Sequence, residues 1–424
     1  MSRQIRHGQS HASLLRNVST GLVPPTRSGL DAIVVPAARA SLQRAISLSA
    51  ELSVPLVLLC SKQAKIDKVA ERVEGTFGAR ALIVEVPEGY RLPQHDKHLT
   101  SDPDFAELSA GRSSDLSVKR NIGLLLAKMR GWSKILFLDD DISSITGQDI
   151  ERLAGCLDRS PIASMASRYF PDNSVVCHAR RLAGIKQDVF VSGAVLGVNT
   201  QHPAMSFFPD VYNEDWFFFA RHAAARTLPK IGEVRQDEYQ PFADPERAAR
   251  EEFGDLLAEG MYALFESMPG WDFDEQLSAA SSTRHWERFT LNREAIIDET
   301  STALDRCLDG AVSKDYPKIL EAQLSLQYAR EQLGNISPAA CARFLASWQT
   351  DERRWQEVLA DCGSVRGERD ALDELELRNW ISCGFGIGRT LAPLRPVPAF
   401  KSQSDLCAAG GVPEQLAFAS GLES

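Results

Sequence analysis

The chain has 424 residues, of which 44% are hydrophobic and 25% charged, as in a globular protein that buries a sizeable core and has room for two domains. Its 47 basic and 57 acidic residues give a net charge of −10, which argues against nucleic acid as a partner. The eight cysteines form no CxxC pair, so we expect reduced thiols rather than a zinc site or disulfides. Because no stretch is apolar enough for a membrane span or a signal core, we expect a cytoplasmic protein.

The first part of the chain alternates short apolar runs with amphipathic segments. Residues 1–28 are polar, and we expect them to form a flexible leader. The runs DAIVVP, PLVLLC and ALIVEVP predict buried strands, and the first and third of them end at a proline. The segments between them, at 38–52 and 62–78, predict helices.

A polar stretch at 88–114 predicts a long surface loop, and it is followed by a helix at 116–131 and by the apolar strand KILFL. Strands that alternate with helices at these lengths predict a parallel, doubly wound α/β sheet. In such sheets ligands bind at the carboxyl ends of the strands, which is where three aspartates follow KILFL.

The second part of the chain becomes increasingly helical. We expect a helix near 149–158, short strands at 162–167 and 189–198, and a helix that begins at NEDW with Asn213 as its N-cap. Residues 287–360 are mostly helix-forming, and the sequence from 382 is rich in Gly, Pro and Ala. The predicted organisation is therefore a leader at 1–28, an α/β domain at 29–268, a helical region at 269–381 and an irregular tail at 382–424.

The aspartates of ILFLDDDISS carry the strongest chemical signal. In an extended chain alternate side chains point the same way, so Asp139 and Asp141 can converge on one ligand. Two carboxylates with diphosphate oxygens and water make an oxygen site suited to Mg²⁺ or Mn²⁺. The plainer alternative is that these aspartates only cap the strand or the turn that follows it.

Three other segments carry polar or conformational signals. Glu214 and Asp215 lie in the first turn of a predicted helix, where the helix dipole keeps a carboxylate ionised and able to act as a base. Lys119 and Arg120 begin the helix before the aspartates, where they suit a diphosphate. Gly193 lies in an apolar run and allows a ligand or another backbone to approach closely. First-turn acids and solvated helix charges remain the plain alternatives.

Together these segments resemble the GT-A glycosyltransferases, in particular their family-2-like branch. The matching pieces are IVVPAARA, VKRNIGLLLAKMRGWSKILFLDDDI, VSGAVLGV and FFPDVYNEDWFFF, in this order over residues 30–264. The resemblance implies an α/β, Rossmann-like GT-A domain that binds a nucleotide sugar, followed by a mainly helical C-terminal region. It also implies a metal-dependent glycosyltransferase that uses a nucleoside-diphosphate sugar as donor.

In that family the DxD motif binds a divalent cation, Mn²⁺ or Mg²⁺, that bridges the donor diphosphate. By position, the resemblance implies Asp139 and Asp141 as metal ligands, and Asp215, with Glu214 beside it, as the catalytic base. We take His285 as the candidate third metal ligand. The residues that we expect around the nucleotide sugar are Pro36, Ala37, Arg39, Ser61, Lys119, Arg120, Asn121, Asp140 and Gly193.

The chain also departs from the family. Many members end the second strand with an aspartate that contacts the nucleotide base, whereas this chain has Cys60, Ser61 and Lys62 there, so the base stays open. The QxxRW segment of processive synthases is absent, which argues against a processive membrane enzyme. A sugar-1-phosphate nucleotidyltransferase and a non-catalytic sugar-nucleotide-binding or scaffold protein remain alternatives. The acceptor, the stereochemical outcome and a homo-oligomer contact through the helical region stay open.

Overall fold

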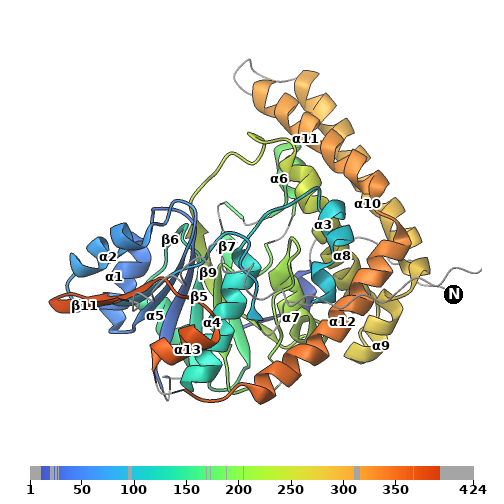
Figure 1. The fold of residues 1–424 in the computed structure, drawn as a ribbon. Helices are drawn as coiled ribbons and strands as arrows, with labels where there is room; N and C mark the ends of the chain where they lie inside the picture. The colour runs from blue at the N-terminus through green and yellow to red at the C-terminus, as the bar shows by residue number, and fades with distance from the viewer. Residues whose placement is uncertain are drawn as a thin grey trace, which may run out of the picture. The chain divides into compact units, whose positions relative to one another are not determined.

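The described residues fold around one sheet of eleven strands that lies between helices (Figure 1). The computed structural model describes residues 11–19, 23, 26, 28–93, 98–168, 170–171, 173–187, 189–203, 205–309, 316–365 and 367–391. In spatial order the strands are β1 (Leu15–Asn17), β9 (Leu228–Gln236), β7 (Ile162–Arg168), β8 (Val195–Asn199), β5 (Lys134–Leu138), β2 (Ala32–Ala37), β3 (Leu56–Cys60), β4 (Arg80–Glu85), β10 (Trp380–Gly384) and β11 (Ile387–Leu391), and β6 (Ile142–Ser144) pairs with β9.

The central sheet is mixed but mostly parallel. Strands β5, β2, β3 and β4 run parallel to one another, as do β1, β9 and β7. Strand β8 runs antiparallel between β5 and β7, with Leu136 opposite Gly197. The α/β class with a largely parallel sheet agrees with the sequence, but the reversed β8 was not predicted, because an apolar run does not encode strand direction.

Helices account for most of the remaining described residues. They are α1 (Gln43–Leu52), α2 (Ile66–Glu74), α3 (Pro103–Leu108), α4 (Leu116–Arg130), α5 (Gly147–Cys156), α6 (Val175–Leu182), α7 (Glu214–Ala224), α8 (Arg247–Ser267), α9 (Phe273–Ala280), α10 (Thr283–Asp309), α11 (Tyr316–Asn335), α12 (Pro338–Asp361) and α13 (Glu368–Glu374). Two short 3-10 helices, Ala12–Leu14 and Leu99–Ser101, complete the set. In the described part of the chain no helix combines the length and the apolar character needed to cross a membrane.

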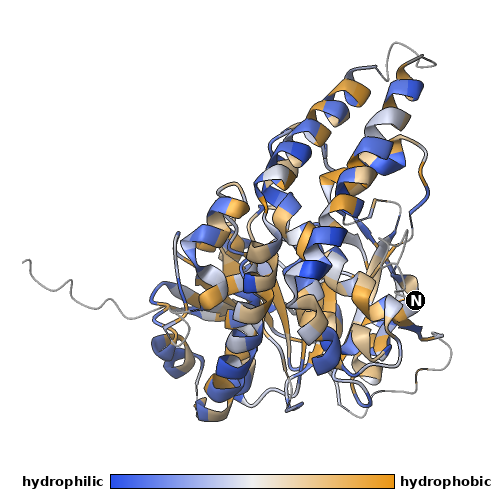
Figure 2. Cartoon of the chain, turned by 90° about the vertical axis from the view of Figure 1, so that its right-hand side faces the viewer, coloured by the Kyte–Doolittle hydropathy of each residue, from blue (hydrophilic) through white to orange (hydrophobic). Residues whose placement is uncertain are grey.

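The two faces of the sheet bury alternate residues of the same strands. Ile33 and Val35 of β2 pack with apolar residues of α1, α2 and α5 on one face. On the other face, a Cβ atom at Gly123 of α4 would lie 2.8 Å from the ring of Phe137 and 2.9 Å from Val34, so glycine lets α4 lie close to the sheet. Figure 2 shows the strands coloured mainly as hydrophobic, between helices of mixed colour. This close packing fixes α4 against the end of β5.

Helix α8 connects the sheet to the later helices and is buried along almost its whole length. Arg293 of α10 donates to Glu252 of α8 at 2.8 Å and to Asp255 at 2.6 Å, and all three side chains are buried. A buried cation between two carboxylates holds its partners firmly, because removing any member leaves an uncompensated charge. The α/β part and the helices form one compact unit that ends at Leu391.

Three segments differ from the sequence prediction. Leu15–Asn17, expected in a flexible leader, forms β1 beside Leu228–Lys230. Residues 380–391, which overlap the expected irregular tail, form β10 and β11 at the other edge of the sheet. The expected loop at 88–114 contains α3, and the backbone N–H groups of Leu99 and Thr100 donate to Asp351 of α12. Edge strands and such ties depend on main-chain hydrogen bonds, which side-chain patterns do not reveal.

Candidate functional site

Each of the three aspartates after β5 has a different set of partners. Asp140 accepts hydrogen bonds from the backbone N–H groups of Ala38 and Arg39 at 2.8 and 2.7 Å, and from Arg39 Nη1 at 3.0 Å. Asp140 therefore fixes the loop that follows β2. Arg39 Nη1 also lies 2.6 Å from Asp141 Oδ2, so Asp140 and Asp141 share one guanidinium.

Asp139 faces the buried guanidinium of Arg120 on α4. Arg120 Nη2 donates to the two oxygens of Asp139 at 3.0 and 3.1 Å, and Arg120 Nη1 donates to Glu214 Oε1 at 2.6 Å. The side chain of Arg120 is only 2% exposed. One cation thus joins the end of β5 to the first turn of α7, so DDD and NEDW belong to a single site. Burial raises the pKa of Asp139, and Arg120 offsets only part of that rise.

Asp141 has a more accessible cationic partner. Arg39 Nη1 lies 2.6 Å from Asp141 Oδ2, and Gln236 Nε2 donates to the same oxygen at 3.0 Å. The side chain of Arg39 is 53% exposed, whereas that of Asp141 is 9% exposed. Burial and repulsion by Asp139 raise the pKa of Asp141 above its ordinary value. Burial therefore disfavours the ionised forms of Asp139 and Asp141, and the two arginines offset only part of that effect.

Asp215 is held by backbone groups at the start of α7. Its Oδ2 accepts from Gly193 N at 2.6 Å, and its Oδ1 accepts from Trp216 N at 2.9 Å. Burial, followed by repulsion from Glu214, raises the pKa of Asp215 to about 7. A carboxyl group with such a pKa can exchange a proton near neutral pH, as a general base must.

Gly193 lets the Arg120 guanidinium approach the backbone of the segment before β8. A Cβ atom at Gly193 would lie 2.7 Å from Arg120 Nη1 and 2.8 Å from Arg120 Cζ, closer than real contacts allow. The glycine that the sequence singled out for close approach therefore accommodates a side chain of the protein itself.

Lys119 and Asn121 hold α4 to its neighbours. Lys119 Nζ donates to Ala37 O at 3.0 Å and to Ser61 Oγ at 2.7 Å, and it lies 3.0 Å from Asp115 Oδ2. It thereby ties the ends of β2 and β3 to α4, next to Pro36, which lies within β2. Asn121 exchanges two hydrogen bonds with the backbone of Phe208, at 2.8 and 2.9 Å. These contacts give Asn121 a structural role.

His285 lies among the helices rather than with the aspartates. Its Nε2 is 3.1 Å from Gly260 O, and its ring packs against Trp286 and Phe289. Burial lowers the pKa of His285 to about 4, so the ring is neutral. Among the described residues, no three His, Cys, Asp or Glu side chains converge as a metal-ligand group, so His285 does not complete one with Asp139 and Asp141.

Two residues of the site were not identified from the sequence. Gln236 ends β9 and reaches Asp141, and Arg112 lies between Asp210 Oδ1 at 3.4 Å and Glu214 Oε2 at 3.8 Å. Arg112 belongs to the polar stretch before α4, whose charge was the only available signal. Gln236 gave none, because an amide at the end of a strand is common in any sheet.

Comparisons with known proteins find likenesses among solved structures. No family model and no curated protein sequence matches the chain. Among solved structures, the chain is similar to the mannosyltransferase PcManGT from Pyrobaculum calidifontis, in complex with GDP-Man and Mn²⁺, with 11% identity and a TM-score of 0.37. The match covers 78% of this chain and 90% of that chain. Because a TM-score in this range does not establish a shared fold, a function has to be inferred from the residues of this chain itself.

Proposed function

We propose that the protein is a metal-dependent glycosyltransferase, which moves a sugar from a nucleoside-diphosphate sugar to an acceptor hydroxyl. The observation that carries the proposal is the bridge made by Arg120. This buried cation contacts Asp139 at 3.0 Å and Glu214 at 2.6 Å. The contact supports a donor role for the first acidic group and an acceptor role for the second. Both pairs lie at strand or helix ends next to the carboxyl edge of the sheet, where α/β proteins bind ligands.

The residues present fit a divalent cation. Two buried carboxylates, Asp139 and Asp141, have raised pKa values, and mutual repulsion contributes at Asp141. Additional positive charge would relieve that repulsion. Arg39 is more than half exposed and can leave Asp141 without unfolding any element. Mg²⁺ and Mn²⁺ commonly bind through one or two carboxylates, with phosphate oxygens and water completing the shell, so a third protein ligand is not required.

The chain's own residues would then divide the reaction between them. When bound, the cation would neutralise the charge that develops on the leaving diphosphate. Arg120 holds Asp139 and Glu214 in place, and Lys119 fixes the ends of β2 and β3 beside the donor. In an inverting reaction Asp215 takes the acceptor proton while the acceptor oxygen forms a bond to the anomeric carbon. The bond from that carbon to the diphosphate oxygen breaks, and the nucleoside diphosphate leaves.

Hydrolysis and binding of nucleotide sugars test this proposal. UDP-, GDP-, ADP- and dTDP-sugars are screened with Mn²⁺ by thermal shift, and released nucleotides are identified by chromatography. We expect one donor class to stabilise the protein and to yield a nucleoside diphosphate slowly, and we expect EDTA to abolish both effects. A sugar-1-phosphate nucleotidyltransferase would instead make a nucleotide sugar and pyrophosphate from a nucleoside triphosphate.

Matched Asp→Asn substitutions test whether donor binding depends on the aspartates of the site. Asp139→Asn and Asp141→Asn should each weaken metal-dependent donor binding by more than about tenfold. Asp67→Asn makes the same chemical change at a side chain that is 76% exposed on α2, and should leave binding unchanged. If no nucleotide sugar binds, or if both site variants bind as the wild type does, the proposal is wrong.

A further inference from the structure

A group of cationic and aromatic side chains surrounds α6, outside the site described above. We define the α6 cluster as Phe170, His178, Arg181, Tyr239 and Arg247. Phe170 stacks on His178 with ring centres 5.0 Å apart, and Tyr239 meets Phe170 edge to face at 4.8 Å. The Arg247 guanidinium lies 4.5 Å from the centre of the Tyr239 ring. The cluster therefore combines segments that follow β7 and β9 with the start of α8.

Arg181 supplies a cation that lacks a carboxylate partner among the described residues. Its Nη1 donates to Asn173 Oδ1 at 2.6 Å, while its Nη2 is buried and makes no hydrogen bond within the described part of the chain. Burial lowers the pKa of Arg181, as expected for a cation that no nearby carboxylate compensates. An unsatisfied buried donor is destabilising, and a bound anion would satisfy it.

Positive charge is in excess around the cluster. Arg247 Nε is paired with Glu251 at 2.6 Å, which compensates that one cation. Lys318 of α11 is exposed. Burial lowers the pKa of His178 to about 3, and repulsion from Arg181, Arg247 and Lys318 adds to this shift. His178 is thus neutral, and its Nε2 lies 3.2 Å from the Tyr239 hydroxyl. Within the described ranges, neither Arg181 nor Lys318 forms an ion pair with a carboxylate.

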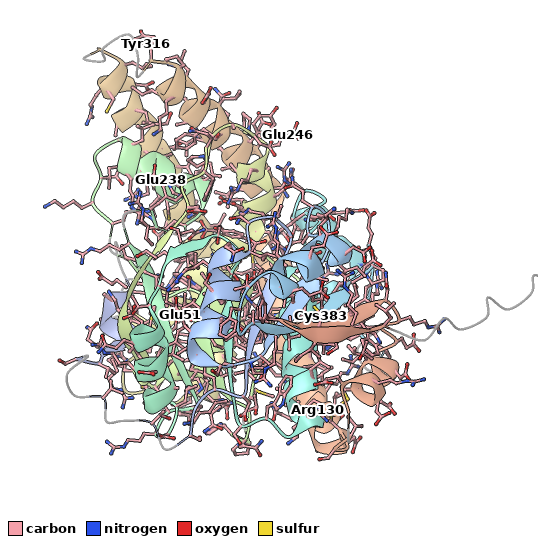
Figure 3. All side chains as sticks on the ribbon, turned by 90° about the vertical axis from the view of Figure 1, so that its left-hand side faces the viewer. Glu51, Arg130, Glu238, Glu246, Tyr316 and Cys383 are labelled. Atoms are coloured by element: carbon pink, nitrogen blue, oxygen red, sulfur yellow. The ribbon has the colours of Figure 1, made fainter. Side chains whose placement is uncertain are left out.

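The α6 cluster is connected to both carboxylate pairs of the candidate site through short segments and side-chain contacts. Tyr239 comes three residues after Gln236, which donates to Asp141 at 3.0 Å. Asn213, directly before Glu214, donates a hydrogen bond to Asp255 at 3.0 Å. Burial raises the pKa of Cys177 on α6, and the charge of Asp255 raises it further. Figure 3 shows Glu238 and Glu246, in the segment between β9 and α8, in the same upper part of the molecule as Tyr316 at the start of α11.

From this arrangement we propose that the α6 cluster binds an oxyanion, a carboxylate or a phosphate, carried by the acceptor molecule. Arg181 Nη2 would donate to the anion, Lys318 would add charge from the helical region, and the Phe170 and Tyr239 rings would border the rest of the acceptor. The identity of the ligand as an acceptor rests on the proposed glycosyltransferase function, but the anion site does not. The helices after α8 thereby gain a role, because α11 supplies one of the two charges.

Binding measurements without donor or metal test the site. Calorimetry compares inorganic phosphate, glucose, glucuronate and glucose 6-phosphate on the full-length protein at low salt. We expect the two anionic sugars to bind at least about tenfold more tightly than glucose, since hydrogen bonds between a cation and an anion are stronger than those between neutral groups. Comparing the affinities for glucuronate and glucose 6-phosphate shows whether the site prefers a carboxylate or a phosphate. Absence of binding by all three anions would overturn the inference.

Variants assign the binding to this cluster. Arg181→Gln should weaken anion binding about 10- to 100-fold, and Lys318→Gln, at an exposed position, should weaken it about 2- to 5-fold without disturbing folding. Arg330→Gln removes a charge from the same helix α11 at a residue paired with Asp298 at 2.8 Å, and should bind as the wild type does. Anion binding that persists unchanged in both cluster variants belongs to the donor site and refutes the inference. The nucleotide-sugar screen fails or succeeds independently of these results.

Discussion

Replacing Gly193 with alanine perturbs the candidate site through a single methyl group. The added Cβ would lie 2.7 Å from Arg120 Nη1, 2.8 Å from Cζ and 2.9 Å from Nη2. The guanidinium cannot simply retreat, because it is bound to Asp139 and Glu214 and lies 5.5 Å from the ring centre of Phe208. Either the segment before β8 moves, or Arg120 leaves one of its carboxylates.

These two responses set the range of the expected loss in the free energy of unfolding. Overpacking a well-packed interior costs about 1–3 kcal/mol, and breaking a buried ion pair costs about 3–5 kcal/mol. We therefore expect Gly193→Ala to lower the free energy of unfolding by about 3 kcal/mol, visible as a fall of several degrees in Tm, together with loss of donor binding. Scanning calorimetry and the donor thermal-shift assay measure both effects.

Gly232→Ala is the matched control for this substitution. Gly232 lies in β9 of the same sheet, and a Cβ atom there would meet nothing within 4 Å. The control should change stability by less than about 0.5 kcal/mol. If Gly193→Ala is as stable as Gly232→Ala and still binds the donor, Arg120 is not confined as described and the bridge does not organise the site.

The charged groups lead to three further predictions. Because burial and Glu214 raise the pKa of Asp215 to about 7, the rate of sugar transfer should increase with pH through neutrality. A pH–rate profile that stays flat from about pH 5 to about pH 9 would contradict this. Asp215→Asn should abolish the pH dependence. For His11, burial opposes protonation but Glu259 and Glu266 raise its pKa to about 9. Protonated His11 therefore adds about 3 kcal/mol to the free energy of unfolding below the unfolded-state pKa of about 6.5, and this contribution is lost as the pH rises through about 9. In chemical denaturation, the stability of His11→Gln should depend less on pH than that of the wild type. Arg39→Gln removes the cation that competes at Asp141, so Mn²⁺ affinity without nucleotide, measured by electron paramagnetic resonance, should rise about 2- to 5-fold, and an unchanged affinity would speak against displacement.

Local patterns in the sequence predicted much of the α/β part, because each apolar run is short and most of them end at a proline or at acids. KILFL became β5, and NEDW became the first turn of α7, as expected. The partners of the aspartates could not be predicted. Arg120 and Arg39 were expected near a nucleotide, yet here they pair with Asp139 and Asp141 themselves. An ion pair between distant segments depends on packing, which no spacing in the sequence records.

His285 also shows that residue type alone does not predict which partners a side chain has. A histidine downstream of an acidic pair has the chemistry of a metal ligand, but its surroundings decide what it does. Here α8 offers Gly260 O to one ring nitrogen, and Trp286 and Phe289 cover the ring. Asn121 likewise has suitable donors for a diphosphate and uses them on the backbone of Phe208. Residue type predicts what a side chain can bind, whereas burial and neighbours determine what it binds.

The pairing of β10 with β4 links the end of the compact unit to its first half. Trp380 lies opposite Val84 and Gly384 opposite Arg80, so a strand near the end of the unit covers the outer edge of β4. During synthesis, at about 5–20 residues per second, that edge stays uncovered for tens of seconds after β4 has emerged. An open strand edge invites pairing with other chains. The nascent protein therefore passes through a period in which it depends on dilution or on chaperones, and any chain cut short before Trp380 would remain in that state permanently.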